Sequence, residues 1–201
     1  LTAGSGVVHS EGAPAAFRAA GGTLHLIQLW VNLPATHKAL PPKYEAHAAA
    51  EVPQLELAPG LQAALYAGTL AGQTGPVTPV TPMILALLTL EPGIRYELDL
   101  PPAFEAALYT LQGPLYQQLS SAGDELDLYP QKHLLHYPAA GAPLCLALAE
   151  TESQPSSVLL LAGVPINEPL VSYGPFVMNS RAEIETAIAD YQSGKMGNLA
   201  E

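Results

Sequence analysis

The sequence has 201 residues but only one cysteine, Cys145, and this scarcity limits its chemistry. A lone cysteine cannot form a disulfide within the chain, and the lack of a cysteine cluster excludes a thiolate zinc site. Basic residues are also few, because 7 Lys and Arg stand against 18 Asp and Glu, for a net charge of −11. A chain this acidic repels phosphate backbones, so we expect no direct binding to nucleic acid. Solubility is the simplest role for the charge, which alone identifies no partner.

Long apolar runs are missing as well. No stretch reaches the ~18 uninterrupted apolar residues of a membrane span. The first residues have neither the basic nor the apolar region of a signal peptide, so we expect a cytoplasmic location and no membrane partner. Hydrophobic residues still make up 49% of the chain, enough for a core, and 20 Pro and 17 Gly favour short strands joined by tight turns.

The repeated short apolar segments of the second part predict an antiparallel sandwich or barrel. We predict its strands at residues 62–67, 83–90, 95–100, 106–111, 114–119, 133–137, 144–150 and 158–162. Two earlier segments, 7–11 and 24–33, also have strand character, and prolines open a predicted short helix over 41–51. Ser180-Arg-Ala-Glu183 has capping-box spacing and predicts an amphipathic helix over 181–193 that packs on a sheet face.

The best candidate for chemistry is Gly4-Ser-Gly6-Val-Val-His9-Ser-Glu11. Strand alternation would place His9 and Glu11 on one face, and imidazole nitrogen with carboxylate oxygen suits a divalent transition metal. Two donors fall short of the three or more that a facial iron site needs. From the residues alone, an ordinary hydrogen-bonded His/Glu pair on a barrel wall is the commoner alternative.

Further motifs give the chain a resemblance to a known family. They are Thr2-Ala-Gly-Ser-Gly-Val-Val-His-Ser-Glu11, Gln28-Leu-Trp-Val-Asn-Leu-Pro34, Lys43-Tyr44 with Val52-Pro53, Ala162-Gly-Val-Pro-Ile-Asn-Glu-Pro169 and Gly174-Pro-Phe-Val-Met-Asn179. In order and spacing these segments resemble the pirin family, whose members consist of two cupin barrels side by side. The resemblance implies an all-β bicupin with an incomplete N-terminal barrel, a complete C-terminal barrel and a C-terminal helix. It assigns residues 1–57 to the remnant of the first cupin and its connector, 58–179 to the second cupin, and 180–201 to the helix and tail.

The same resemblance implies a metal site in the first barrel. Pirins hold one metal, usually iron, through three His and one Glu, and His9 and Glu11 match two of these four ligands. No His-Pro-His motif precedes them here, so we expect an N-terminally truncated chain that binds metal weakly and is inactive alone. Gln28, Trp30 and His25 are candidate pocket-lining residues, although a packing or surface role is the alternative for His25. In the second barrel Tyr96 and Leu98 stand near the places of metal ligands, so we expect that barrel to be metal-free.

Two functions follow from the resemblance. The first is ring-opening oxidation of a small aromatic, flavonol-like substrate by a quercetin 2,3-dioxygenase-type enzyme in the full-length protein. The second is a non-enzymatic regulatory role, as a transcription or metabolic cofactor that binds a protein partner.

Overall fold

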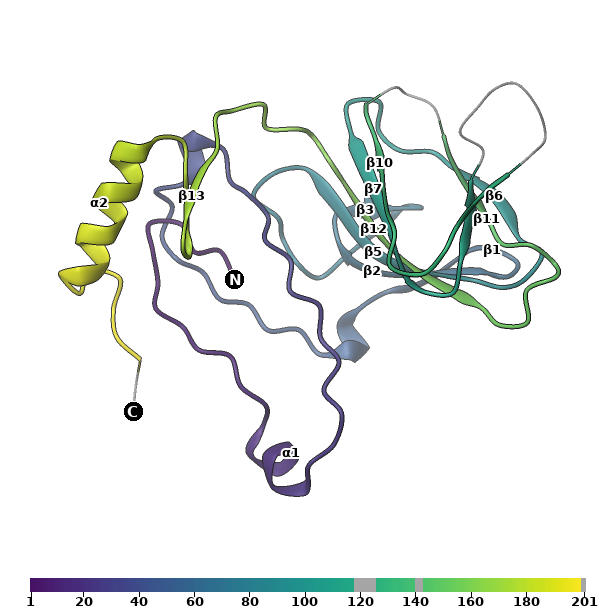
Figure 1. Cartoon of the computed structure of the whole chain (residues 1–201), viewed down its shortest axis with the longest axis horizontal. Helices are drawn as coiled ribbons and strands as arrows, with labels where there is room; N and C mark the ends of the chain where they lie inside the picture. Colours follow the sequence, from purple (N-terminus) through teal and green to yellow (C-terminus); the bar gives the residue numbers. More distant parts are fainter. Residues whose placement is uncertain (118–125, 140–142, 200–201) are drawn as a thin grey trace. The chain divides into compact units, whose positions relative to one another are not determined.

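The computed structural model describes residues 1–117, 126–139 and 143–199. It divides into two compact units. The first consists of Leu1–Glu45 with Ile166–Glu201, and the second of Ala46–Pro165 (Figure 1). The three ranges 1–57, 58–179 and 180–201 remain a prediction about domain organisation.

The second unit is built from antiparallel strands. They are β1 (Gln54–Ala58), β2 (Leu61–Ala67), β3 (Thr69–Leu70), β4 (Gln73–Thr74), β5 (Met83–Leu90), β6 (Arg95–Leu98), β7 (Glu105–Gln112), β8 (Leu115–Gln117), β9 (Asp127–Tyr129), β10 (Leu134–Tyr137), β11 (Leu144–Ala147) and β12 (Ser156–Gly163). A six-stranded sheet has the order β1-β2-β5-β12-β7-β10, and a four-stranded sheet has the order β6-β11-β8-β9. Figure 1 shows the two sheets facing one another, while β3 and β4 form a small separate hairpin.

One hydrophobic core lies between these two sheets. Along β5 every second side chain is buried, from Ile84 to Leu90, because successive residues of a strand point to opposite faces. Leu160 on β12 in the larger sheet and Leu115 and Leu146 in the smaller sheet are fully buried in the same cluster. Each such leucine contributes roughly 1.5–3 kcal/mol by leaving water, which fixes the register of both sheets.

The strand predictions for this unit are confirmed, with ends that move by a few residues. The prediction at 83–90 coincides with β5, and 95–100 and 144–150 shorten to β6 and β11. Of the strand predicted at 114–119, β8 covers Leu115–Gln117 and positions 118 and 119 lie outside the described residues. We did not predict β1, the β3–β4 pair or β9, which are short or lie at a sheet edge with much of their surface exposed.

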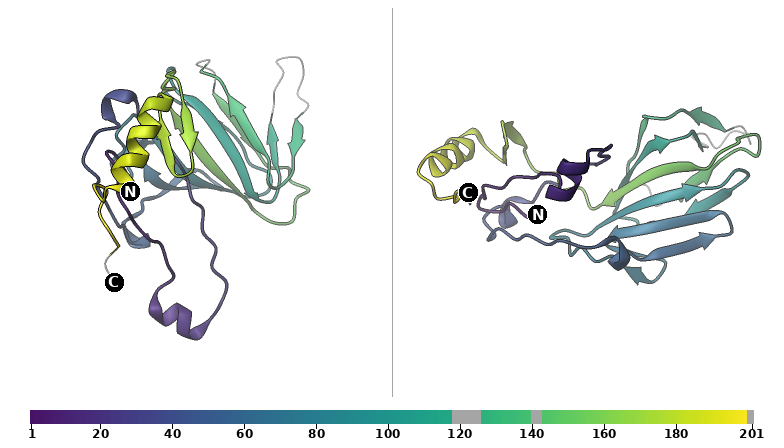
Figure 2. Two further views of the ribbon diagram at one scale, coloured as in Figure 1. Left: turned by 60° about the vertical axis from the view of Figure 1, so that its left-hand side comes forward. Right: turned by 90° about the horizontal axis from the view of Figure 1, so that it is seen from below.

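The first unit contains little regular structure. Its elements are α1 (Ala15–Ala20), the 3₁₀ turn η1 (Ala35–His37), β13 (Val171–Tyr173), β14 (Phe176–Met178) and α2 (Arg181–Gln192). β13 and β14 pair through a two-residue turn in which Gly174 has φ 55°, a conformation that favours glycine. Figure 2 shows α2 (yellow) beside this hairpin, where the Phe176 and Tyr191 rings meet edge to face with centroids 6.3 Å apart.

The predicted C-terminal helix is confirmed as α2. The Ser180 Oγ accepts a hydrogen bond from the Glu183 N–H (3.3 Å), and the Glu183 carboxylate accepts from the Asn179 N–H (3.0 Å). Both hydrogen bonds of a capping box are therefore present, except that the Glu183 carboxylate accepts from the N–H one residue before Ser180. Ile184 is buried, as the apolar stripe requires. No helix among the described residues is long and apolar enough to span a membrane.

Three local predictions in the first 51 residues are wrong. Residues 7–11 and 24–33 form no strand, and 41–51 is no helix apart from the 3₁₀ turn η2 (Ala49–Glu51). Residues 24–33 make no backbone hydrogen bond to any other described residue. Because a strand exists only through its ladder to a neighbour, a segment with high β propensity stays irregular without one. Trp30 illustrates the result, since 64% of its surface is exposed.

Candidate metal centre

The segment that carries His9 and Glu11 is shaped by backbone hydrogen bonds rather than by a sheet. The Ser5 N–H donates to the Leu40 carbonyl (2.8 Å), and the Val8 N–H donates to the Met196 carbonyl (2.9 Å). Gly4 and Gly6 have φ values of 51° and 113°, which L-residues with side chains rarely adopt. The glycines of the motif therefore set the path that the chain follows to His9.

The structure brings the two predicted ligands close together. The His9 Nδ1 lies 3.9 Å from the Glu11 Oε1, and the two side chains are 44% and 67% exposed. The Gln28 Nε2 donates to the other carboxylate oxygen of Glu11 over 3.4 Å. Gln28 thus occupies Oε2 and leaves Oε1 facing the imidazole.

The donor types fit a divalent transition metal, but the number of donors does not complete a site. Imidazole nitrogen and carboxylate oxygen are suitable ligands, and their spacing allows both to approach one ion. A facial site needs at least a third protein donor. Within the described ranges no group of three or more His, Cys, Asp or Glu side chains comes together. The described residues therefore supply two candidate donors, and their role as metal ligands remains a prediction.

The other predicted pocket residues differ in position. Gln28 contacts Glu11, whereas His25 and Trp30 are exposed and have no hydrogen bond or ion pair with any described residue. The role of these three residues as the wall of a pocket remains a prediction.

Sequence reasoning missed a polar cluster in the same unit. Lys38 is only 8% exposed, and its Nζ donates to the Asn32 Oδ1 (2.6 Å) and the Val177 carbonyl (3.2 Å). Burial lowers the pKa of Lys38, while the nearby carboxylates of Glu168 and Glu183 oppose that shift. The signal in the sequence was the Asn-Glu-Pro169 motif, because the Glu168 carboxylate favours the charged form of Lys38.

Glu168 links the N-terminal and C-terminal parts of this cluster. Its Oε2 accepts from the Ala35 N–H (2.7 Å) and from the Asn179 Nδ2 (2.9 Å). Asn179 also donates to the Pro169 carbonyl (3.0 Å). The cluster therefore fastens the segment around residues 32–38 to the hairpin and the start of α2.

Two residues of β6, which the resemblance puts near the places of metal ligands, face the hydrophobic core of the second unit. Leu98 is buried, and Tyr96 packs against the core. A polar contact does cross this interior: the Tyr137 hydroxyl donates to the Gln117 Oε1 (2.6 Å). Gln117, which is 1% exposed, donates in turn to the carbonyl oxygens of Tyr116 and Cys145. Hydrogen bonds between uncharged groups thus join β10 to β8 and β11.

Comparisons with known proteins agree with the fold and the motifs. The family model of the pirin C-terminal cupin domain matches residues 85–197. A Pseudomonas aeruginosa protein that carries the provisional name quercetin 2,3-dioxygenase is 36% identical over 97% of this chain. Human pirin is 29% identical over 98% of it. The chain spans 65% and 64% of these two relatives.

A solved structure gives the same answer. The crystal structure of quercetin 2,3-dioxygenase from Acinetobacter baumannii superposes with a TM-score of 0.74 at 31% identity, over 85% of this chain and 56% of that one. The fold is therefore of the cupin type, with a C-terminal helix. The chain belongs to the pirin family.

Proposed function

We propose that the full polypeptide to which these residues belong is a metal-dependent quercetin 2,3-dioxygenase-type enzyme that opens the ring of a flavonol-like substrate. The observation that carries the proposal is the imidazole–carboxylate pair of His9 and Glu11, whose Nδ1 and Oε1 atoms lie 3.9 Å apart on a segment that follows Gly4 and Gly6. The named relatives support this chemistry, because quercetin 2,3-dioxygenases are among the proteins that this chain is similar to.

His9 and Glu11 would supply two ligands to one divalent transition metal, with iron as the first candidate. Such a metal would supply Lewis acidity for the substrate's oxygen atoms. Gln28 would hold the Glu11 carboxylate in place by occupying Oε2, so that Oε1 remains for the ion. His25 and Trp30 would line the substrate cavity from the segment that contains Gln28.

Two donors alone would bind metal weakly. We propose that the remaining ligands come from a part of the polypeptide outside these 201 residues, for which the greater length of the relatives leaves room. The isolated chain would then be inactive. We place the enzyme in the cytoplasm.

The test is quercetin consumption and metal content in the full polypeptide encoded by the gene, with His9→Ala and Glu11→Ala variants. Both variants should lower metal affinity by on the order of 10–100-fold and abolish turnover. The matched control is His136→Ala, which removes an imidazole from another exposed His–Glu pair, with 3.3 Å between Nε2 and the Glu105 Oε2. Full activity in His9→Ala, or no quercetin consumption by a metal-loaded wild type, would contradict the proposal.

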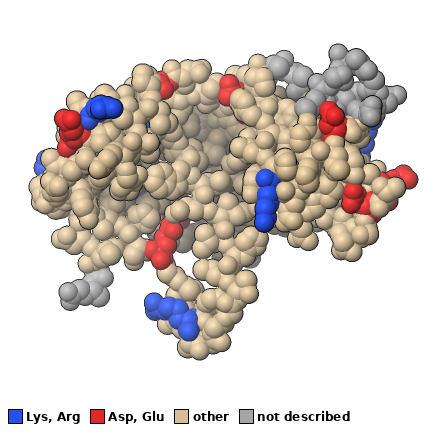
Figure 3. Space-filling view, in the orientation of Figure 1, with Lys and Arg blue, Asp and Glu red and all other residues tan. Residues whose placement is uncertain are grey.

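A second candidate is a regulatory protein that binds another protein without catalysis. It is favoured by residues 24–31, where Leu24, Leu26 and Trp30 are each more than half exposed. Nucleic acid is a poor partner, since the net charge is −11 and Lys and Arg form no cluster among the described residues on the face in Figure 3. Cross-linking in the native cell would distinguish the enzyme from the regulatory protein. A catalytically competent protein that cross-links to no stable partner would exclude the regulatory role.

A further inference from the structure

The two glycines before His9 are pressed against two different parts of the chain. A Cβ at Gly4 would collide with the Leu40 carbonyl oxygen. A Cβ at Gly6 would lie 2.6 Å from the Met196 Sδ and 2.6 Å from its Cγ, so the flexible Met196 side chain would have to move to make room for it. Gly4 therefore packs against the Leu40 backbone and Gly6 against the Met196 thioether, and the positive φ of both residues favours glycine.

Met196 also contacts this segment through its backbone. Its carbonyl accepts the hydrogen bond from the Val8 N–H (2.9 Å), and Val8 directly precedes His9. The thioether and the carbonyl together contact residues 6 and 8, which leaves little freedom in the direction from which the chain enters His9. The side chains of His9 and Glu11 are exposed, and the long hydrogen bond from Gln28 reaches Glu11 but not His9.

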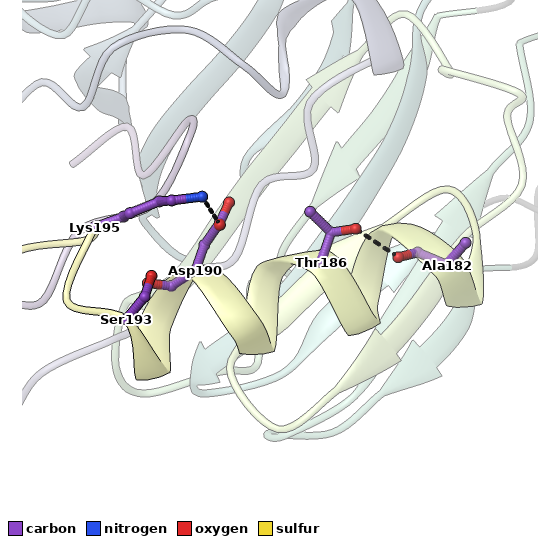
Figure 4. A network of polar contacts seen from close by, with 5 residues as sticks. All are labelled: Ala182, Thr186, Asp190, Ser193 and Lys195. Carbon is purple, nitrogen blue, oxygen red and sulfur yellow. Dashed lines mark hydrogen bonds and ion pairs between the residues drawn. The ribbon is translucent and has the colours of Figure 1, made fainter.

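The position of Met196 is set by the end of α2. The Lys195 N–H donates to the Asp190 carbonyl and the Gly194 N–H to the Tyr191 carbonyl, each over 3.0 Å, which are the two bonds of a Schellman motif. Figure 4 shows the Lys195 ammonium paired with the Asp190 carboxylate, close to Ser193. The Ser193 hydroxyl donates to the Asp190 carbonyl as well (3.0 Å). These hydrogen bonds set the path of the backbone from the end of α2 to Met196.

We propose that Met196 is a positioning residue for the centre at His9 and Glu11, and that the turn after α2 fixes the segment carrying both ligands. This inference rests on the proposed function, because it assigns to Met196 the preorganisation of that site. A ligand pair on a segment held in place binds an ion more tightly than the same pair on a mobile loop, since less freedom is lost on binding.

The test uses the full polypeptide with Met196→Ala and Met196→Leu, titrated with Co²⁺ and followed by its visible absorption. Amide hydrogen exchange of residues 6–11 is measured in parallel. Met196→Ala should lower Co²⁺ affinity about tenfold and speed exchange at Val8, while Met196→Leu, which restores the bulk against Gly6, should behave as the wild type does. Met83→Ala, on β5 of the other unit, removes the same kind of side chain and should change neither quantity.

Met196 follows the last helix and belongs to no described helix or strand, so the variants should keep the circular dichroism of the wild type. If the wild type binds Co²⁺ and Met196→Ala binds it equally well with unchanged exchange at Val8, the positioning role is wrong. If the wild type binds no Co²⁺, the proposed function fails. The exchange rates would then still decide whether Met196 fixes residues 6–11.

Discussion

The hydrogen bond between Tyr137 and Gln117 makes a quantitative prediction about the second unit. Tyr137→Phe removes the donor and leaves the Gln117 Oε1 buried without its partner. An unsatisfied buried acceptor costs about 1–3 kcal/mol, so we expect the free energy of unfolding to fall by that amount. Gln117→Leu leaves the Tyr137 hydroxyl without its acceptor and also removes the amide that donates to two carbonyl groups. We expect this variant to lose at least as much free energy of unfolding.

The double variant tests whether the two losses share one cause. Replacing both partners by apolar side chains leaves neither half of the bond unsatisfied, so the double variant should lose less than the sum of the single losses. We expect a coupling of roughly 0.5–3 kcal/mol. Tyr173→Phe is the control, because that tyrosine is 67% exposed and a surface change should stay within about 0.5 kcal/mol.

The assay is urea unfolding followed by circular dichroism of the strands, with the wild type and all four variants in one buffer. The free energy of unfolding should fall with urea concentration at the same slope in every protein, so that shifts in the unfolding midpoint can be converted into free energies. Strictly additive losses would refute the reasoning, since they would mean that Tyr137 and Gln117 do not bond across the interior.

Three further predictions concern pH, the helix cap and the core. Burial raises the pKa of Tyr137 above the unfolded value of about 10, so stability should be full below about pH 10 and fall as the pH rises towards the folded pKa. Urea midpoints at about pH 8 and about pH 11 should show a smaller fall for Tyr137→Phe than for the wild type. Tyr116, whose pKa the bond to Glu152 raises, contributes in the same direction as Tyr137, and Lys38, whose pKa burial lowers, contributes in the opposite direction. Ser180→Ala removes the acceptor for a first-turn N–H and should lower the free energy of unfolding by about 1 kcal/mol in thermal unfolding. Ser180→Thr keeps a hydroxyl at this position and should retain most of the stability. Leu160→Ala, at a fully buried position in a central strand, should cost about 2–5 kcal/mol in urea unfolding, and a loss below 1 kcal/mol would contradict the packing.

The second unit was predictable because its strands carry their pattern locally. In β5 alternate residues are buried, and the flanking Pro and Gly marked where it stops. The α2 helix was predictable for a similar reason, because Ser180 and Glu183 cap it in the way that their spacing indicates. In both cases the residues that decide the structure are neighbours in sequence.

The first unit was less predictable because its contacts are distant in sequence. Residues 24–33 have the composition of a strand, yet what they become depends on a neighbouring strand that the segment itself does not specify. Likewise, the contact between Gly6 and Met196 joins residues 190 positions apart, and the burial of Lys38 depends on Val177 and Glu168. The motif around His9 identified the residues of the candidate site but not what holds them.

The most direct test of the proposed metal centre is the metal content of the full polypeptide encoded by the gene, measured by elemental analysis after purification. The wild type should hold about one divalent transition metal per chain, with iron as the main ion, and His9→Ala and Glu11→Ala should each lose it. A well-folded wild type without metal, or a His9→Ala variant that retains the full amount, would contradict the assignment of these two residues as ligands.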